Sequence, residues 1–223
     1  MPTLRSGSLD QFRHPNFSVD MASVHESEGE ALIEYLEQSV RAGKRFNDGD
    51  TVNIGWGRLK LLADESGNLA VHEPSFKEMP IKWILGANKT YAHLSLQKQV
   101  CKEVGAEPDF PSLMQAGIVS EYMLEHSGPF QMDRHSGDGQ GNSGWALYEI
   151  GKADAEGVKW VSLYQIGTIY PQTIPFFGLP QDAIVIYQID RIQVAYGDRE
   201  IDSNSNSFLQ QLLSSKNYGS VHF

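Results

Sequence analysis

Cysteine is almost missing from this sequence of 223 residues, in which Cys101 stands alone. One thiol excludes an intramolecular disulfide and any zinc site that needs several cysteine ligands. Cys101 falls within an expected helix, where a small buried thiol is more typical than a catalytic nucleophile. The fold is therefore expected to depend on its hydrophobic core and not on cross-links.

Long hydrophobic runs are missing too. No apolar stretch approaches the roughly 20 residues that cross a bilayer. Residues 1–19 contain no continuous apolar segment of the kind that signal peptides carry. The sequence therefore predicts a protein without a membrane span and with a cytoplasmic location.

Basic residues are scarce relative to acidic ones. The sequence has 18 Lys and Arg against 28 Asp and Glu, which gives a formal net charge of −10 at pH 7. Nucleic acids and anionic membranes attract proteins with clustered Lys and Arg, so neither is an expected partner. A protein of this charge is better suited to a partner that is itself basic.

Complete motifs for metal binding and catalysis are also lacking. The seven histidines form neither an H-E-x-x-H pattern nor a close pair, so the sequence predicts no metal site. Asp202, Asn204 and Asn206 copy the start of an EF-hand calcium loop. The glycine and the bidentate glutamate that such a loop requires are replaced by Ser207 and Leu213. We therefore predict no catalytic residue, no cofactor and no enzymatic activity.

A glycine-rich segment offers the alternative function. Gly139, Gly141 and Gly144 form a literal G-x-G-x-x-G, which in dinucleotide-binding folds opens a helix that holds a pyrophosphate. Here the residues after Gly144 favour a strand, and Tyr164 stands where an acidic residue would bind the ribose. We interpret the segment as a flexible hairpin connection. The alternative is a nucleotide- or phosphate-binding protein or enzyme that uses the Gly137–Gly144 loop.

The first part of the chain predicts a helix, a β-hairpin and a second helix. The first helix should begin at the capping box of Ser27 and Glu30 and end at Gly43. A strand over residues 52–61, which can accommodate a bulge near its glycines, should return through a turn as a hairpin. The second helix should run from about residue 89 to residue 104, with an asparagine as its cap.

The rest of the chain is rich in β-branched and aromatic residues. These predict strands over residues 118–124, 129–134, 144–150 and 183–196, and short helices within residues 160–169 and 208–213. Strands and helices do not alternate regularly, so the predicted class is α+β, with a mainly antiparallel sheet in this region. The expected organisation is a flexible N-terminal arm (1–26), an N-terminal α+β unit (27–108), a β-rich domain (109–202) and a C-terminal linker with a short helix (203–223).

Several short motifs in the second half carry a resemblance. They are Arg134, Asn142-Ser143-Gly144-Trp145, Val161-Ser162-Leu163, Ile174-Pro175 and Gly178-Leu179-Pro180. Together, over roughly residues 112–196, they resemble a small bacterial family of immunity proteins of polymorphic toxin systems. In that family a strand that ends in arginine leads through a polar loop to an S-G-W strand. This sequence departs from the family pattern at Asn142, where an aspartate is usual, and at His135, where a glutamate is usual.

The resemblance implies a non-enzymatic immunity protein that binds and neutralises a cognate bacterial toxin domain. Many toxins of such systems act on nucleic acid and carry basic grooves, which the acidic composition suits. An interaction adaptor with another partner would share these features. The predicted partner-binding residues are Asp133, His135 and Asp138, and the predicted motif residues are Arg134, Ser143, Gly144 and Trp145. Arg134 and Trp145 are expected to hold the loop between them in place, as a buried or half-buried pair.

Overall fold

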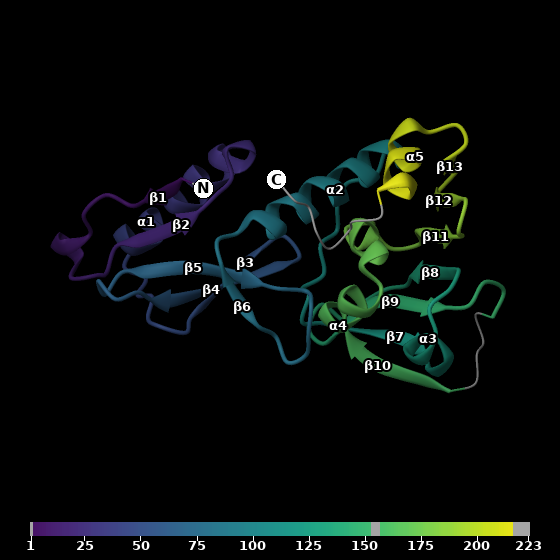
Figure 1. Ribbon diagram of the computed structural model, residues 1–223, viewed down its shortest axis with the longest axis horizontal. Coiled ribbons are helices and arrows are strands. Elements are labelled where there is room, and N and C mark those ends of the chain that lie inside the picture. The colour runs from purple at the N-terminus through teal and green to yellow at the C-terminus, as the bar shows by residue number, and fades with distance from the viewer. Residues whose placement is uncertain (1, 153–156, 216–223) are drawn as a thin grey trace. The chain divides into compact units, whose positions relative to one another are not determined.

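The computed structural model describes residues 2–152 and 157–215, and its mixture of helices and strands confirms the α+β class. The chain divides into two units: unit 1 ends at Ala92, and unit 2 begins at His93. This division falls inside helix α2 (Asn88–Val104) and not after residue 108, the boundary expected from the sequence. Figure 1 shows α2 as one continuous helix.

Unit 1 contains a six-stranded sheet and a long helix. Its strands are β1 (Thr3–Arg5), β2 (Phe17–Asp20), β3 (Thr51–Ile54), β4 (Gly57–Ala63), β5 (Leu69–Pro74) and β6 (Trp83–Leu85). They lie in the order β1-β2-β5-β4-β3, with β6 beside β5, and β2 runs parallel to β5. Helix α1 (Glu26–Arg41) directs Leu32, Leu36 and Val40 into the core.

The first 26 residues are not the flexible arm that their composition predicted. They supply β1, β2 and the short 3₁₀ turns η1 (Asp10–Phe12) and η2 (Ser23–His25). Phe17 and Val19 of β2 are buried in the core of unit 1. Their alternation has the period of a strand, but it is too short to stand out among the Ser, Pro and Asn residues around it.

Two local predictions for unit 1 are also wrong. Helix α1 has His25 at its N-cap, so the predicted capping box does not form, and the Ser27 hydroxyl donates to Glu28 instead. The stretch expected as one strand over residues 52–61 is a hairpin, because the chain reverses at Gly55 between β3 and β4. Gly55 has a φ of 56°, a left-handed conformation that favours glycine.

Helix α2 is confirmed, but its N-terminus is capped by a residue from a distant strand. The buried carboxylate of Glu73 in β5 accepts hydrogen bonds from the backbone N–H groups of Lys89 (3.0 Å) and Thr90 (2.7 Å). The expected cap, Asn88, instead accepts a hydrogen bond from the N–H of Ala22 (2.6 Å). Burial raises the pKa of Glu73, and the two N–H donors oppose that rise.

Replacing Glu73 with alanine is expected to lower the free energy of unfolding by about 1–3 kcal/mol, because two N–H groups at the start of α2 lose their acceptor. Glu73→Gln keeps an acceptor oxygen and is the matched control, with a smaller expected loss. Urea denaturation followed by far-UV circular dichroism measures both variants. Wild-type stability in Glu73→Ala would contradict the capping role.

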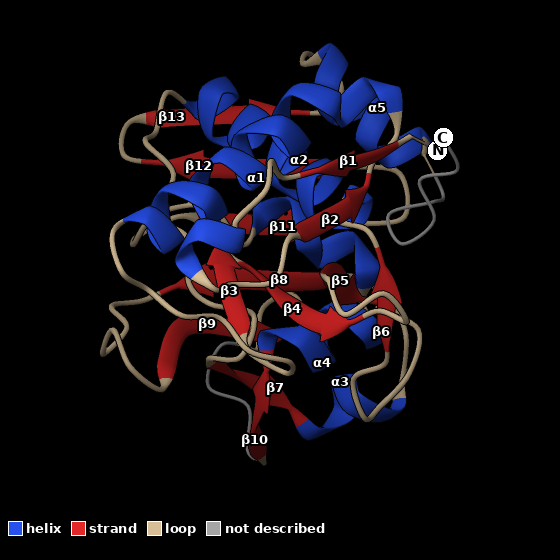
Figure 2. Cartoon of the chain, turned by 90° about the vertical axis from the view of Figure 1, so that its left-hand side faces the viewer, coloured by secondary structure: helices blue, strands red, loops and turns tan. Residues whose placement is uncertain are grey.

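Unit 2 contains a seven-stranded sheet. Its strands are β7 (Ala116–Ser120), β8 (Phe130–Arg134), β9 (Asn142–Tyr148), β10 (Val158–Ser162), β11 (Ile184–Tyr187), β12 (Ile192–Tyr196) and β13 (Arg199–Asp202). Their order is β10-β7-β9-β8-β11-β12-β13, which Figure 2 shows from bottom to top. The β7–β9 pair is parallel and the other pairs of this sheet are antiparallel, so the sheet is mainly antiparallel, as predicted.

Short helical segments complete unit 2. They are α3 (Glu121–Glu125), α4 (Leu163–Ile169), η3 (Pro171–Phe176) and α5 (Ser207–Ser214). Two segments expected as single strands are interrupted. The strand expected over residues 118–124 ends at Ser120, whose hydroxyl caps α3, and the one expected over residues 183–196 is the β11–β12 hairpin.

The sheet of unit 2 has two different faces. Val119, Met132, Leu147, Val185 and Val194 are at most 2% exposed and point to the side on which α4 and α5 pack. Because side chains alternate along a strand, the residues next to these in the sequence point to the opposite side. We call that opposite side the outward face.

Candidate functional site

The S-G-W motif forms a β-bulge at the start of β9. In the β7–β9 pair, Ala116 lies opposite Asn142 and Ile118 lies opposite Ala146. Three residues of β9 therefore lie opposite a single residue of β7, Gly117. These three residues are Ser143, Gly144 and Trp145. A bulge bends the strand locally and redirects its side chains. The S-G-W motif is therefore explained by the backbone geometry of this bulge.

The bulge requires a glycine at its centre. Gly144 has a φ of 80°, and its carbonyl accepts a hydrogen bond from the N–H of His135 (2.8 Å). A Cβ at this position would overlap the carbonyl oxygen of His135. The buried Ser143 hydroxyl accepts a hydrogen bond from the N–H of Trp145 (3.2 Å), which fixes the other half of the bulge.

The glycine-rich segment is a hairpin connection, as the sequence analysis interpreted it. It joins β8 to the antiparallel β9, and Asp138 organises it from within. Its Oδ1 atom accepts hydrogen bonds from the N–H groups of Gln140, Gly141 and Asn142, each at 2.8 Å. A bound phosphate would need N–H groups of this kind. Since the Asp138 carboxylate already occupies them, the loop does not present a phosphate cradle at these three residues.

These hydrogen bonds lower the pKa of Asp138, with the largest effect from the N–H of Asn142. A lowered folded-state pKa contributes stability above the unfolded value of about 3.9, and this contribution is lost as the pH falls through the folded value. We therefore expect the stability difference between wild type and Asp138→Asn to shrink at acidic pH. Urea denaturation at several pH values measures it, and NMR titration of the Asp138 carboxyl carbon gives the pKa. A titration midpoint at or above about 3.9 would contradict the prediction.

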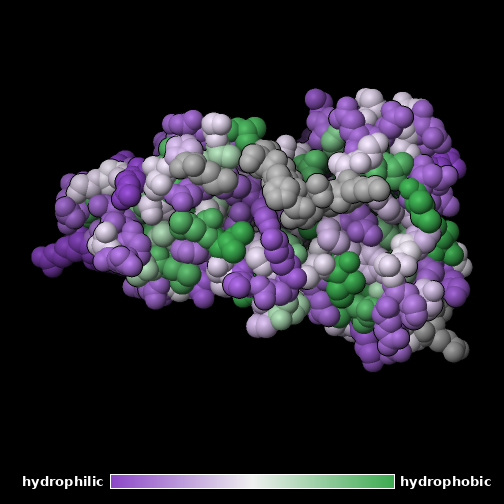
Figure 3. Space-filling model, in the orientation of Figure 1, coloured by the Kyte–Doolittle hydropathy of each residue, from purple (hydrophilic) through white to green (hydrophobic). Residues whose placement is uncertain are grey.

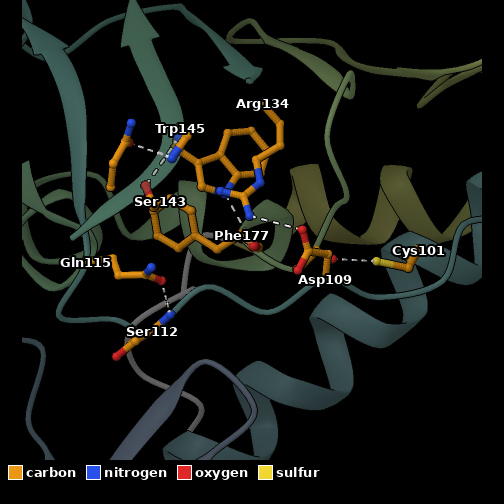
Figure 4. A network of polar contacts seen from close by, with 11 residues as sticks. Cys101, Asp109, Ser112, Gln115, Arg134, Ser143, Trp145 and Phe177 are labelled. Atoms are coloured by element: carbon orange, nitrogen blue, oxygen red, sulfur yellow. Dashed lines mark hydrogen bonds and ion pairs between the residues drawn. The ribbon is translucent and has the colours of Figure 1, made fainter. Parts of the chain in front are cut away.

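Arg134 and Trp145 lie opposite each other on β8 and β9. Both point away from the outward face, to the side that also holds Met132 and Leu147. They are 6% and 1% exposed, and the guanidinium carbon lies 5.6 Å from the centre of the indole ring, within range of a cation–π contact. Figure 4 shows the pair together with its two polar anchors. Arg134 Nη2 donates to Asp109 Oδ2 (3.3 Å), and Trp145 Nε1 donates to the carbonyl of Phe177 (3.3 Å).

The charge of Arg134 is only partly compensated. Its Nε and Nη1 atoms are buried and have no hydrogen-bond acceptor among the residues that the structure describes. Burial lowers the pKa of Arg134, and the nearby Asp109 carboxylate opposes that change. Sequence reasoning missed Asp109, because no motif links it to an arginine 25 residues away.

A pocket of about 310 Å³ opens beside this pair. It is lined by residues 109–111, Gln115, the β8–β9 loop and Gln181. Arg134 contributes to the wall, so the pocket combines a buried guanidinium with the carboxylate of Asp109 and the exposed His135. Such a set of polar groups suits a polar or charged group better than it suits an apolar ligand.

The structure distributes the three predicted partner-binding residues over two places. Asp133 is half-buried on the outward face of β8, where its Oδ1 accepts a hydrogen bond from Gln131 Nε2 (2.9 Å). His135 and Asp138 are exposed in the β8–β9 loop. Asp133 and the neighbouring Arg134 therefore point to opposite faces of the sheet, and only Arg134 contacts Trp145.

Cys101 is buried in α2 and its thiol donates to the carbonyl of Gly178 (3.2 Å). Burial raises the pKa of this thiol to about 12, which keeps it protonated at neutral pH. Within residues 2–152 and 157–215, no three His, Cys, Asp or Glu side chains gather as metal ligands. No helix in that part of the chain has the length and apolar character of a membrane span.

Comparisons with known proteins bear on this region. The comparisons with curated proteins and with solved structures found no match. A family model described as the Imm33-like domain matches residues 96–198, which include the S-G-W bulge, the Arg134–Trp145 pair and the β8–β9 loop. The match begins earlier than the motifs indicated, because it includes part of α2. This partial match, to residues 96–198, is consistent with the immunity-protein family that the short motifs resemble.

Proposed function

We propose that this protein is a non-enzymatic immunity protein of the bacterial cytoplasm, and that unit 2 binds and neutralises a cognate toxin domain. The Imm33-like match over residues 96–198 is the observation that carries this proposal. An inhibitor of this kind needs a stable scaffold and a complementary surface, which at a typical interface buries about 800 Å² on each partner. The bulge and the buried Arg134–Trp145 pair support such a scaffold.

The distribution of charge supports a basic partner. Residues 93–221 contain 15 Asp and Glu against 8 Lys and Arg, so unit 2 has a formal charge of −7 out of the −10 of the whole chain. The face of the molecule drawn in Figure 3 is mainly hydrophilic, with apolar side chains in separate groups. A toxin that acts on nucleic acid presents a basic surface, which a charge of this sign attracts over long range.

The test mixes the full chain with the toxin domain encoded beside its gene. We expect a complex with a Kd below about 1 μM by isothermal titration calorimetry, and loss of the toxic activity at equimolar ratio. Association should slow as ionic strength rises, because salt screens the attraction. A toxin domain of an unrelated class is the matched control. Neither binding nor protection with the neighbouring toxin would contradict the proposal.

A further inference from the structure

We propose that the outward face of the unit 2 sheet is the toxin-binding surface, with Trp160 of the edge strand β10 as its apolar anchor and with a basic surface of the toxin as its occupant. This inference rests on the proposed function and assigns it a place on the molecule. The strand register, the exposure of outward side chains and the charges on this face carry it.

Strand register places apolar residues side by side on the outward face. Trp160 of β10 lies opposite Ile118 of β7, and Ile118 lies opposite Ala146 of β9. Across β8, Ile184 of β11 lies opposite Ala195 of β12. One row of the outward face therefore carries apolar residues on five of the seven strands.

Exposure marks two parts of this row as unusual. Trp160 is 56% exposed and Ile184 is 40% exposed, and Val158, which shares the outward side of β10, is 46% exposed. An antiparallel sheet with one face in water normally has polar residues on that face. Trp160 and Val158 lie two residues apart on the same side of β10, whereas Ile184 lies four strands away in the sheet order. Neighbouring exposed large apolar side chains such as Trp160 and Val158 indicate an interaction site, and tryptophan is a frequent anchor at protein interfaces.

The position of β10 adds a second means of recognition. β10 ends the strand order of the sheet, so its backbone is paired on one side, with β7, among the described strands. An edge strand can extend its sheet by pairing with a strand of another protein. Trp160 and Val158 would then lie beside the side chains that the added strand presents on the same face of the sheet, and would contact the apolar ones.

The charges on the outward face select the partner. Its Asp, Glu, Lys and Arg residues within the seven strands are Asp133, Glu200 and Asp202, and all three are acidic. Asp202 forms an ion pair with Arg191, whereas Asp133 and Glu200 are contacted by the neutral amides of Gln131 and Gln193. Neither Asp133 nor Glu200 forms an ion pair with a residue that the structure describes. Their negative charge complements a basic surface and repels an acidic one.

The experiment uses the neighbouring toxin domain and the full chain with single substitutions. Trp160→Ala is expected to weaken binding at least tenfold, and Asp133→Lys to slow association and reduce its dependence on salt. Tyr35→Ala removes a comparably exposed aromatic side chain from α1 in unit 1 and is the matched control, with unchanged affinity. Circular dichroism and thermal unfolding establish that each variant remains folded.

Hydrogen exchange gives an independent readout on the wild-type protein. We expect the amides of β10 to exchange more slowly in the complex than in the free protein. If wild type binds but Trp160→Ala and Asp133→Lys bind within twofold of it, and β10 gains no protection, the outward face is not the binding surface and the proposed function still stands. If wild type does not bind at all, the proposed function fails and this inference fails with it.

Discussion

Gly144→Ala is expected to lower the free energy of unfolding by about 3 kcal/mol or more. A left-handed backbone conformation costs a residue with a Cβ roughly 1–2 kcal/mol, and the overlap with the His135 carbonyl adds the loss of a ladder hydrogen bond and of strand register. The effect should also reach Trp145, because the bulge positions that side chain. Urea denaturation followed by tryptophan fluorescence measures the change.

Gly139→Ala is the matched control for this substitution. Gly139 also has a positive φ, of 71°, but a Cβ there would meet no atom within 4 Å. Its expected loss is therefore only the conformational part, about 1 kcal/mol. Equal losses for the two variants would show that the close approach at the bulge is unimportant.

Trp145→Ala is expected to destabilise the protein by about 3–5 kcal/mol. This is the usual cost of replacing a fully buried large aromatic residue with alanine. The variant also removes the hydrogen-bond donor for the Phe177 carbonyl and exposes the Arg134 guanidinium to a cavity. Differential scanning calorimetry and urea denaturation measure the loss.

Trp160→Ala provides the comparison within the same sheet. Trp160 is more than half exposed, so its loss should change the free energy of unfolding by less than about 1 kcal/mol. The two substitutions thus separate stability from binding. Trp145→Ala should lower the stability of the fold, whereas Trp160→Ala should fold normally and bind the toxin poorly. A Trp145→Ala variant as stable as Trp160→Ala would overturn the assignment of Trp145 to the core.

Elements were predictable from the sequence where the pattern that identifies them lies within a short stretch of residues. Helix α2 and the short helix α5 were predicted because their apolar residues repeat at helical spacing within a few turns. Segments that reverse direction were predicted less well. The β11–β12 hairpin was predicted as one long strand, since its strands share the same β-branched and aromatic composition and a short turn separates them.

Long-range partners could not be predicted from the sequence. Glu73 caps a helix that begins 15 residues later, and Asp109 reaches Arg134 across 25 residues, yet neither contact leaves a spacing pattern in the chain. The S-G-W motif was found as a resemblance, but its physical basis, a bulge opposite Gly117, required the pairing of β7 with β9. The outward position of Asp133 likewise depends on the register of β8.

The continuity of helix α2 has a practical consequence for studying the Imm33-like region in isolation. A truncated protein that starts at His93 would begin in the middle of this helix and would expose N–H groups that are satisfied within the helix in the full chain. A start before Asn88 would restore the helix but would still lack the carboxylate of Glu73. A serine or aspartate introduced ahead of the helix would supply a local replacement for that missing acceptor.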